Sequence, residues 1–173
     1  MDLCLTMSDV WTFPAEFSAP SFLRQLDTLL RDGDIIAVGA YSPSPRIRVA
    51  LTDLGATDTD ADTIYNTCFR YNRREHPNGR SFELPKTSAT LAFLTAEAER
   101  PGGQDDKPLF FDHIVAYRRG LPVVPLLSFH DAFYGGTLRV SGLYPEATIR
   151  TFAAGLPSTY VSQQNAEGYA NFA

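Results

Sequence analysis

The sequence predicts a two-layer α+β sandwich, in which about four helices pack on a roughly five-stranded, mainly antiparallel sheet. Three observations lead to this fold class. Apolar residues recur with helical spacing between Phe22 and Leu30, and short apolar runs of strand length follow one another in residues 109–141. The chain has 173 residues, 44% of them hydrophobic, which is enough for one hydrophobic core. We therefore expect one globular domain over residues 1–173.

The most regular helical pattern lies near the N-terminus. Ser18, followed by Pro20, is a start signal, because proline is tolerated in the first turn of a helix. Gly33 is expected to end the segment, and residues 3–7 to form a short edge strand before it. The apolar face of this helix consists of Phe22, Leu23, Leu26, Leu29 and Leu30.

The next segment is predicted to be a β-hairpin. Residues 35–41 are an apolar run of strand length, and residues 46–51 alternate between arginine and apolar residues, which is typical of a half-buried strand. The two prolines of residues 42–45 indicate a turn between them.

An acidic run, residues 58–62, resembles the start of a calcium loop. The pattern requires Gly at its sixth position and Glu at its twelfth, and Thr63 and Phe69 stand there. We therefore expect these acids to cap a helix that continues to about Arg74. Its C-terminal end carries a cationic face, which is either a solvated helix end or a site for an anion or an acidic partner. That face consists of Arg70, Arg73 and Arg74 and is continued by His76, Arg80 and Lys86.

The second half of the chain is expected to begin with a helix over residues 86–100, although its first half also alternates as a strand does. An exposed loop rich in Gly and Pro follows near residues 100–108. Residues 109–117, 123–130 and 137–141 are then predicted to form a three-stranded meander, with a bulge or sheet edge at Pro125. A last helix starts at Pro145 and ends before Gly155.

Composition excludes several functional classes. The net charge of −5 and a pI near 5.1 disfavour nucleic acid as a partner. The sequence has no signal-peptide pattern and no apolar stretch of membrane-spanning length, so we expect a cytoplasmic protein that binds no membrane. Cys4 and Cys68 are too few for a disulfide framework or a zinc motif. Gly135 and Gly136 precede a strand and form no phosphate-binding loop, so no cofactor is expected.

Two acid-and-imidazole pairs are the main candidates for chemistry: Asp112 with His113, and His130 with Asp131. If the intervening loop has an even number of residues, the two histidines share a face and lie diagonally on neighbouring strands. If the number is odd, Asp112 lies opposite His130. The competing interpretation is that both histidines are hydrogen-bonded structural residues.

Neither a metal site nor a nucleophile is complete in the sequence. The third histidine, His76, lies in a basic segment that would repel a cation, and no metal ligand set is predicted. Ser128 and Ser141 lack the strand-turn-helix context of a nucleophilic serine, and Cys68 falls on the buried face of its expected helix.

Two functions remain. The first is a non-catalytic protein that binds a protein partner or a small ligand, including the possibility of a toxin-neutralising immunity protein, for which acidic charge would speed association with a basic enzyme. The alternative is a small hydrolase or lyase that uses the histidine and aspartate pairs, with or without a metal. Beyond the cationic face, an anionic group would be bound by Arg118 or Arg139, and Tyr134 would stand at the mouth of the pocket.

Overall fold

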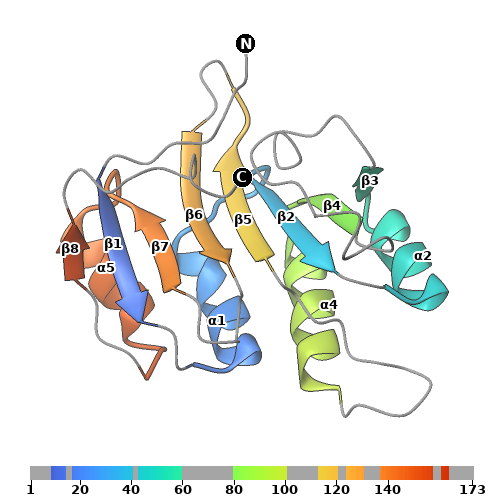
Figure 1. The fold of residues 1–173 in the computed structure, drawn as a ribbon, viewed down its shortest axis with the longest axis horizontal. Helices are drawn as coiled ribbons and strands as arrows, with labels where there is room; N and C mark the ends of the chain where they lie inside the picture. Colours follow the sequence, from blue (N-terminus) through green and yellow to red (C-terminus); the bar gives the residue numbers. More distant parts are fainter. Residues whose placement is uncertain are drawn as a thin grey trace, which may run out of the picture.

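The computed structural model describes residues 9–14, 17–40, 43–59, 80–100, 113–120, 124–130, 137–157 and 161–163. Their helices lie against one sheet (Figure 1). The strands are β1 Val10–Pro14, β2 Ile35–Ala40, β3 Thr57–Thr59, β4 Arg80–Pro85, β5 His113–Arg118, β6 Val124–His130, β7 Thr137–Ser141 and β8 Val161–Gln163. The helices are α1 Ala19–Gln25, which continues into the 3₁₀ turn η1 Leu26–Thr28, α2 Pro45–Asp53, α4 Ser88–Glu99 and α5 Glu146–Ala153.

The sheet has eight strands in the order β3-β4-β2-β5-β6-β7-β1-β8, and every neighbouring pair is antiparallel. The α+β class is confirmed, whereas the expected five strands are too few. β2 is inserted between β4 and β5, which α4 connects, and β1 is inserted between β7 and β8, which α5 connects. Two split β-α-β units are therefore joined by the meander β5-β6-β7.

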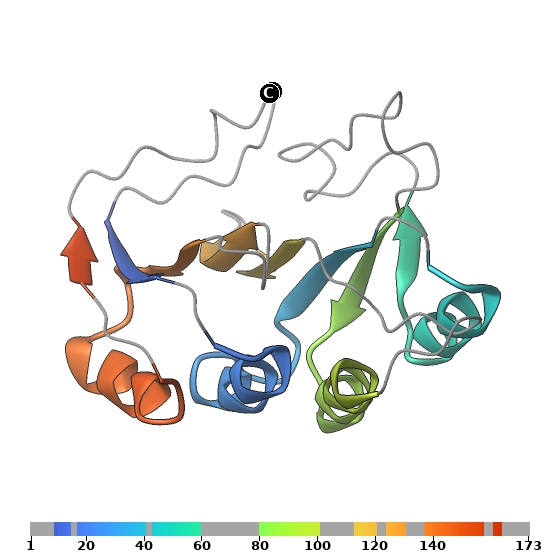
Figure 2. The same cartoon turned by 60° about the horizontal axis from the view of Figure 1, so that its bottom comes forward.

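The helices form one layer on one side of the sheet, with α2 at the end beside β3 (Figure 2). The core between the layers is rich in aromatic residues. Phe22 of α1 lies 5.4 Å from Phe129 of β6 and 6.4 Å from Phe152 of α5, measured between ring centroids. These rings meet edge to face, the arrangement that their quadrupoles favour.

The first helix begins as the sequence predicts. The Ser18 side chain accepts a hydrogen bond from the backbone N–H of Ser21, and Pro20 stands in the first turn. The α-helix is shorter than expected, because it tightens into η1 at Leu26. Gly33 has a φ of 88°, a conformation that favours glycine, and it turns the chain into β2.

The predicted strand at residues 46–51 is wrong, and the segment is helix α2. Ser44 is its N-cap and Pro45 its first residue, so the expected turn is a helix start. Ile47 and Leu51 are four residues apart and both are buried. Residues with this helical spacing face the core, and the alternation with arginine does not indicate a strand.

Four strands were not predicted, namely β1, β3, β4 and β8. Each is short, and two of them, β1 and β8, pair with each other across almost the full length of the chain. The acidic run also begins differently from the prediction, since residues 57–59 form strand β3 against β4. The rest of the expected helix, with Cys68, and the expected edge strand at residues 3–7, with Cys4, lie outside the described residues.

The meander and the later helices agree with the sequence. β6 and β7 occupy nearly the predicted ranges, and β5 covers the second half of its range. The expected irregularity at Pro125 is present: the register of β5 and β6 shifts between Ala116 and Tyr117, which leaves one extra residue on β6. α4 and α5 lie within their predicted segments, whereas residues 101–108 of the expected loop are outside the described part. None of the described helices is long and apolar enough to cross a membrane.

Candidate functional site

The two faces of the sheet differ in chemistry, because side chains alternate along each strand. One face packs on the helices and is apolar. The other face, here called the polar face, is also largely buried: Ser128 is 0%, Ser81 1%, Glu83 4% and His113 5% exposed. Buried polar groups reduce stability unless they are satisfied, so such a face is a candidate site. The polar face consists of Val10, Thr12, Ile35, Ala37, Gly39, Ser81, Glu83, His113, Val115, Tyr117, Ser128, Arg139 and Ser141.

The two histidines are brought together by β5 and β6. His113 and His130 are direct partners in the ladder, so they lie on the same face of the sheet. Neither predicted register is fully correct. Residues 119–123, which separate the paired ends of β5 and β6, are odd in number and by themselves would place Asp112 opposite His130, and the extra residue on β6 brings His113 into that position instead. Gly39 of β2 stands on the other side of His113 and adds no side chain there.

Several predicted site residues lie outside the part of the chain that the structure describes. They include both carboxylates of the acid-and-imidazole pairs, the tyrosine at the expected pocket mouth and the cationic helix face, and for His130 only the backbone is described. The residues concerned are Asp112, Asp131, Tyr134, Arg70, Arg73 and Arg74.

The guanidinium of Arg118 forms an ion pair with Asp34. Its Nε lies 3.0 Å from Oδ1 of Asp34 and one terminal nitrogen lies 3.3 Å from Oδ2, and Asp34 is 1% exposed. The backbone N–H of Arg31 also donates to Asp34. The hydrogen bond to Asp34 raises the pKa of Arg118. This guanidinium neutralises a buried carboxylate, so we do not assign it to a ligand.

Arg139 is different from Arg118. It lies on β7, partly buried, and its ladder partners on the two sides are Ser128 of β6 and Thr12 of β1. Within the described residues its guanidinium makes no hydrogen bond and no ion pair. The Oγ of Ser128, fully buried beside it, also has no hydrogen-bond partner. An unsatisfied hydroxyl next to an uncompensated cation is the arrangement that an anionic ligand would complete.

A third group on the polar face was not predicted. The Tyr117 hydroxyl donates to Oε1 of Glu83 at 2.5 Å, and Arg119 donates to Oε2 at 2.8 Å. Burial, followed by the hydrogen bond to Glu83, raises the pKa of Tyr117, so the phenol stays protonated as a donor. Ala37 of β2 is the ladder partner of Glu83, and its small side chain leaves room for this contact. The one signal in the sequence is the alternation of Ser81 and Glu83 with two apolar residues.

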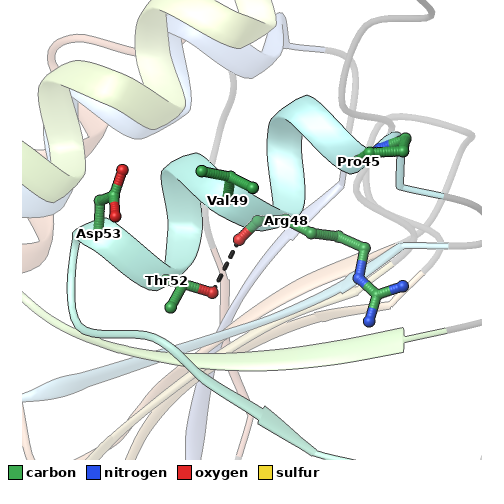
Figure 3. Close-up of a pocket in the computed structure, with 5 residues that line it drawn as sticks. All are labelled: Pro45, Arg48, Val49, Thr52 and Asp53. Atoms are coloured by element: carbon green, nitrogen blue, oxygen red, sulfur yellow. Dashed lines mark hydrogen bonds between the residues drawn. The ribbon is translucent and has the colours of Figure 1, made fainter.

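A shallow depression on α2, of about 400 Å³, is a competing site (Figure 3). It is lined by Pro45, Arg48, Val49, Thr52 and Asp53, and all five are exposed. The Thr52 hydroxyl donates to the backbone carbonyl of Arg48 at 2.9 Å, so it is already satisfied. The depression encloses no buried polar group, which makes it a weaker candidate than the polar face.

Among the residues that the structure describes, no group of three His, Cys, Asp or Glu side chains is arranged to hold a metal ion. Comparisons of the chain with family models, curated proteins and solved structures found no significant match. The candidate site therefore depends on the geometry of the polar face.

Proposed function

We propose that the protein is a non-catalytic binding protein that holds a small ligand on the polar face of its sheet. The observation that carries the proposal is the unsatisfied, fully buried hydroxyl of Ser128. A side chain whose polar atom has lost water without gaining a partner destabilises the free protein by about 1–3 kcal/mol. Such a residue is explained if its partner is a ligand.

A small ligand fits this surface better than a protein partner does. Stable protein interfaces are built around exposed aromatic and apolar anchors. The exposed large hydrophobic residues of the described chain are Val49, on α2, and Leu143, after β7, and neither belongs to the polar face. A basic protein partner, such as a toxin, is therefore the less favoured version of the binding function. The compartment that we propose is the cytoplasm.

The proposal is tested by backbone amide NMR of the isotopically labelled protein. A library of small carboxylates, phosphates, amines and neutral aromatic compounds is added in turn. We expect binders to shift the amide signals of Val115, Ser128 and Arg139 and to leave that of Val49 on α2 unchanged. Binders whose shifts cluster on α2, or a library without any binder to the polar face, would overturn the proposal.

The pairing of His113 with His130 favours a second candidate function, namely acid–base catalysis by a small hydrolase or lyase. Two ionisable groups that interact strongly titrate as a coupled pair, and a positioned histidine contributes roughly 10²- to 10⁴-fold to a rate. The pH dependence of the histidine ring signals separates the two functions. A coupled, strongly shifted pair supports the enzyme, whereas two independent titrations near the ordinary pKa remove it. Metal analysis of the purified protein examines the metal-assisted version.

A further inference from the structure

We infer that the group recognised on the polar face is a single carboxylate, held by Arg139 of β7 and the hydroxyl of Ser128 of β6. This inference rests on the proposed function and names the chemistry of its ligand.

The other arginines of the described chain each have an interaction partner. The ion-paired ones contact carboxylates within 4.0 Å, and Arg48 and Arg80 have interactions of their own. Those in ion pairs are Arg24, Arg31, Arg46, Arg100, Arg118, Arg119 and Arg150. Among the arginines of the described residues, Arg139 is the one that makes no hydrogen bond and no ion pair, although the chain has 20 acidic residues. A partly buried cation left unpaired in an acidic protein is best explained by a partner that comes from outside.

The register places polar and apolar groups in one row beside this cation. Val115, Ser128, Arg139 and Thr12 are successive ladder partners on β5, β6, β7 and β1. Directly opposed residues have Cβ atoms about 4.5–5.5 Å apart, so one carboxylate is within reach of both the Arg139 fork and the Ser128 hydroxyl. Val115, which is buried, gives the adjoining part of the ligand an apolar neighbour.

The charged side chains along this row of ladder partners indicate the charge of the ligand. The nearest carboxylate along the same row is that of Glu83, four strands from Arg139, and it is already bonded to Tyr117 and Arg119. One guanidinium neutralises one negative charge, which suits a carboxylate and leaves a phosphate dianion undercompensated. Because Ser128 has no exposed surface whereas Arg139 is only partly buried, we place the entry of the ligand at Arg139.

The inference is tested by thermal unfolding with benzoate, acetate and inorganic phosphate at constant ionic strength. We expect benzoate to raise the Tm progressively as its concentration increases, acetate to act more weakly and phosphate to have little effect. Arg139→Gln should weaken benzoate binding roughly tenfold or more, since it removes a charge-assisted pair. The matched control is Arg150→Gln on the exposed side of α5, which should keep the wild-type response.

The outcomes distinguish the inference from the proposed function. If benzoate stabilises Arg139→Gln as much as the wild type, or phosphate is the better ligand, the carboxylate inference is overturned. If a neutral or cationic compound shifts the polar-face amides and benzoate does not, the binding function stands and only the ligand class is wrong. If no compound shifts these amides, the proposed function fails as well.

Discussion

At the scale of single residues, the buried charged side chains of the described chain each lie beside an oppositely charged side chain. Lys86 was grouped with an exposed cationic face, yet it is 6% exposed and its Nζ lies 2.7 Å from Asp27 and 3.0 Å from Asp32. The hydrogen bond to Asp27 is the main cause that raises the pKa of Lys86. A buried charge without such a partner is strongly destabilising, so each pair fixes its own segment.

Tyr117→Phe tests the buried group on the polar face. The variant removes the hydroxyl that donates to Glu83. This carboxylate, which is 4% exposed, keeps the hydrogen bond from Arg119. We expect the free energy of unfolding in urea to fall by about 1–3 kcal/mol, because a buried acceptor loses a partner. An unchanged midpoint would show that the Tyr117 hydroxyl contributes nothing to stability.

Tyr144 gives a prediction for alkaline pH. Burial, and then the negative charge of Asp34, raises the pKa of Tyr144 from 10.0 to about 12. Its hydroxyl donates to the backbone carbonyl of Leu29 at 2.5 Å. In the unfolded chain the phenol ionises near its ordinary pKa, whereas in the folded protein it remains protonated. The stability that it contributes is therefore complete below a pH of about 10 and is lost as the pH rises to about 12.

The measurement is the free energy of unfolding of the wild type and of Tyr144→Phe at a series of alkaline pH values. We expect the difference between the two proteins to be constant below a pH of about 10 and to shrink above it. A difference that does not change across this range would mean that the pKa of Tyr144 is the same in the folded and unfolded states.

At the scale of helices and strands, the sequence predicted those elements whose own residues contain both an apolar pattern and a signal for where the element starts or ends. α1 has a capping serine and a regular apolar face, and the meander strands have apolar runs between turn residues. α2 was mistaken for a strand because Ile47 and Val49 fit an alternating pattern, while the buried pair is Ile47 and Leu51. The capping serine before Pro45 was the better signal.

The strand order, and the terminal strands β1 and β8, could not be predicted in the same way. β1 and β2 each enter between two strands that a helix connects, and these pairings join residues far apart in the sequence. β1 has only five residues and β8 only three, so neither has a periodic signal of its own. Long-range pairing, and not local propensity, decides that these segments are strands.

The contact between α2 and α4 gives a prediction at this scale. Arg46 of α2 binds Glu97 of α4 with two hydrogen bonds, of 2.9 and 2.6 Å, and the Glu97 side chain is 9% exposed. We expect a double-mutant cycle with Arg46→Ala and Glu97→Ala to give a coupling of about 1 kcal/mol in the free energy of unfolding, because this geometry is bidentate and partly buried.

The matched control is Glu146 with Arg150, an exposed pair four residues apart on α5. A surface pair of this kind contributes about 0.3–0.5 kcal/mol, so its coupling should be the smaller of the two. Equal couplings for both pairs would show that burial adds nothing to the Arg46–Glu97 contact.

At the scale of the whole molecule, the two faces of one sheet have different roles. The apolar face and the helices provide the core, and the polar face carries the histidine pair, the Ser128–Arg139 row and the Tyr117–Glu83–Arg119 group. The sequence indicated two of these. It singled out both histidines and Arg139, and Pro125 indicated an irregularity in β6. The grouping on the face also depends on the strand order, which no local pattern encodes.

Ser128 shows why site prediction from the sequence was incomplete. The sequence offers it only as a nucleophile, and no motif of a nucleophilic serine surrounds it. Its importance follows from burial without a hydrogen-bond partner, which is a property of the folded sheet. Arg118 shows the opposite outcome. The sequence indicates it as an anion-binding residue equally with Arg139, but in the folded protein it is paired with Asp34.

The measurement that examines the polar face most directly is the unfolding of Ser128→Ala with and without benzoate. We expect the free variant to be more stable than the wild type by about 1 kcal/mol, because an unsatisfied hydroxyl is removed, and benzoate to stabilise it less than it stabilises the wild type. A stabilisation by benzoate equal to that of the wild type would contradict the assignment of Ser128 to a ligand.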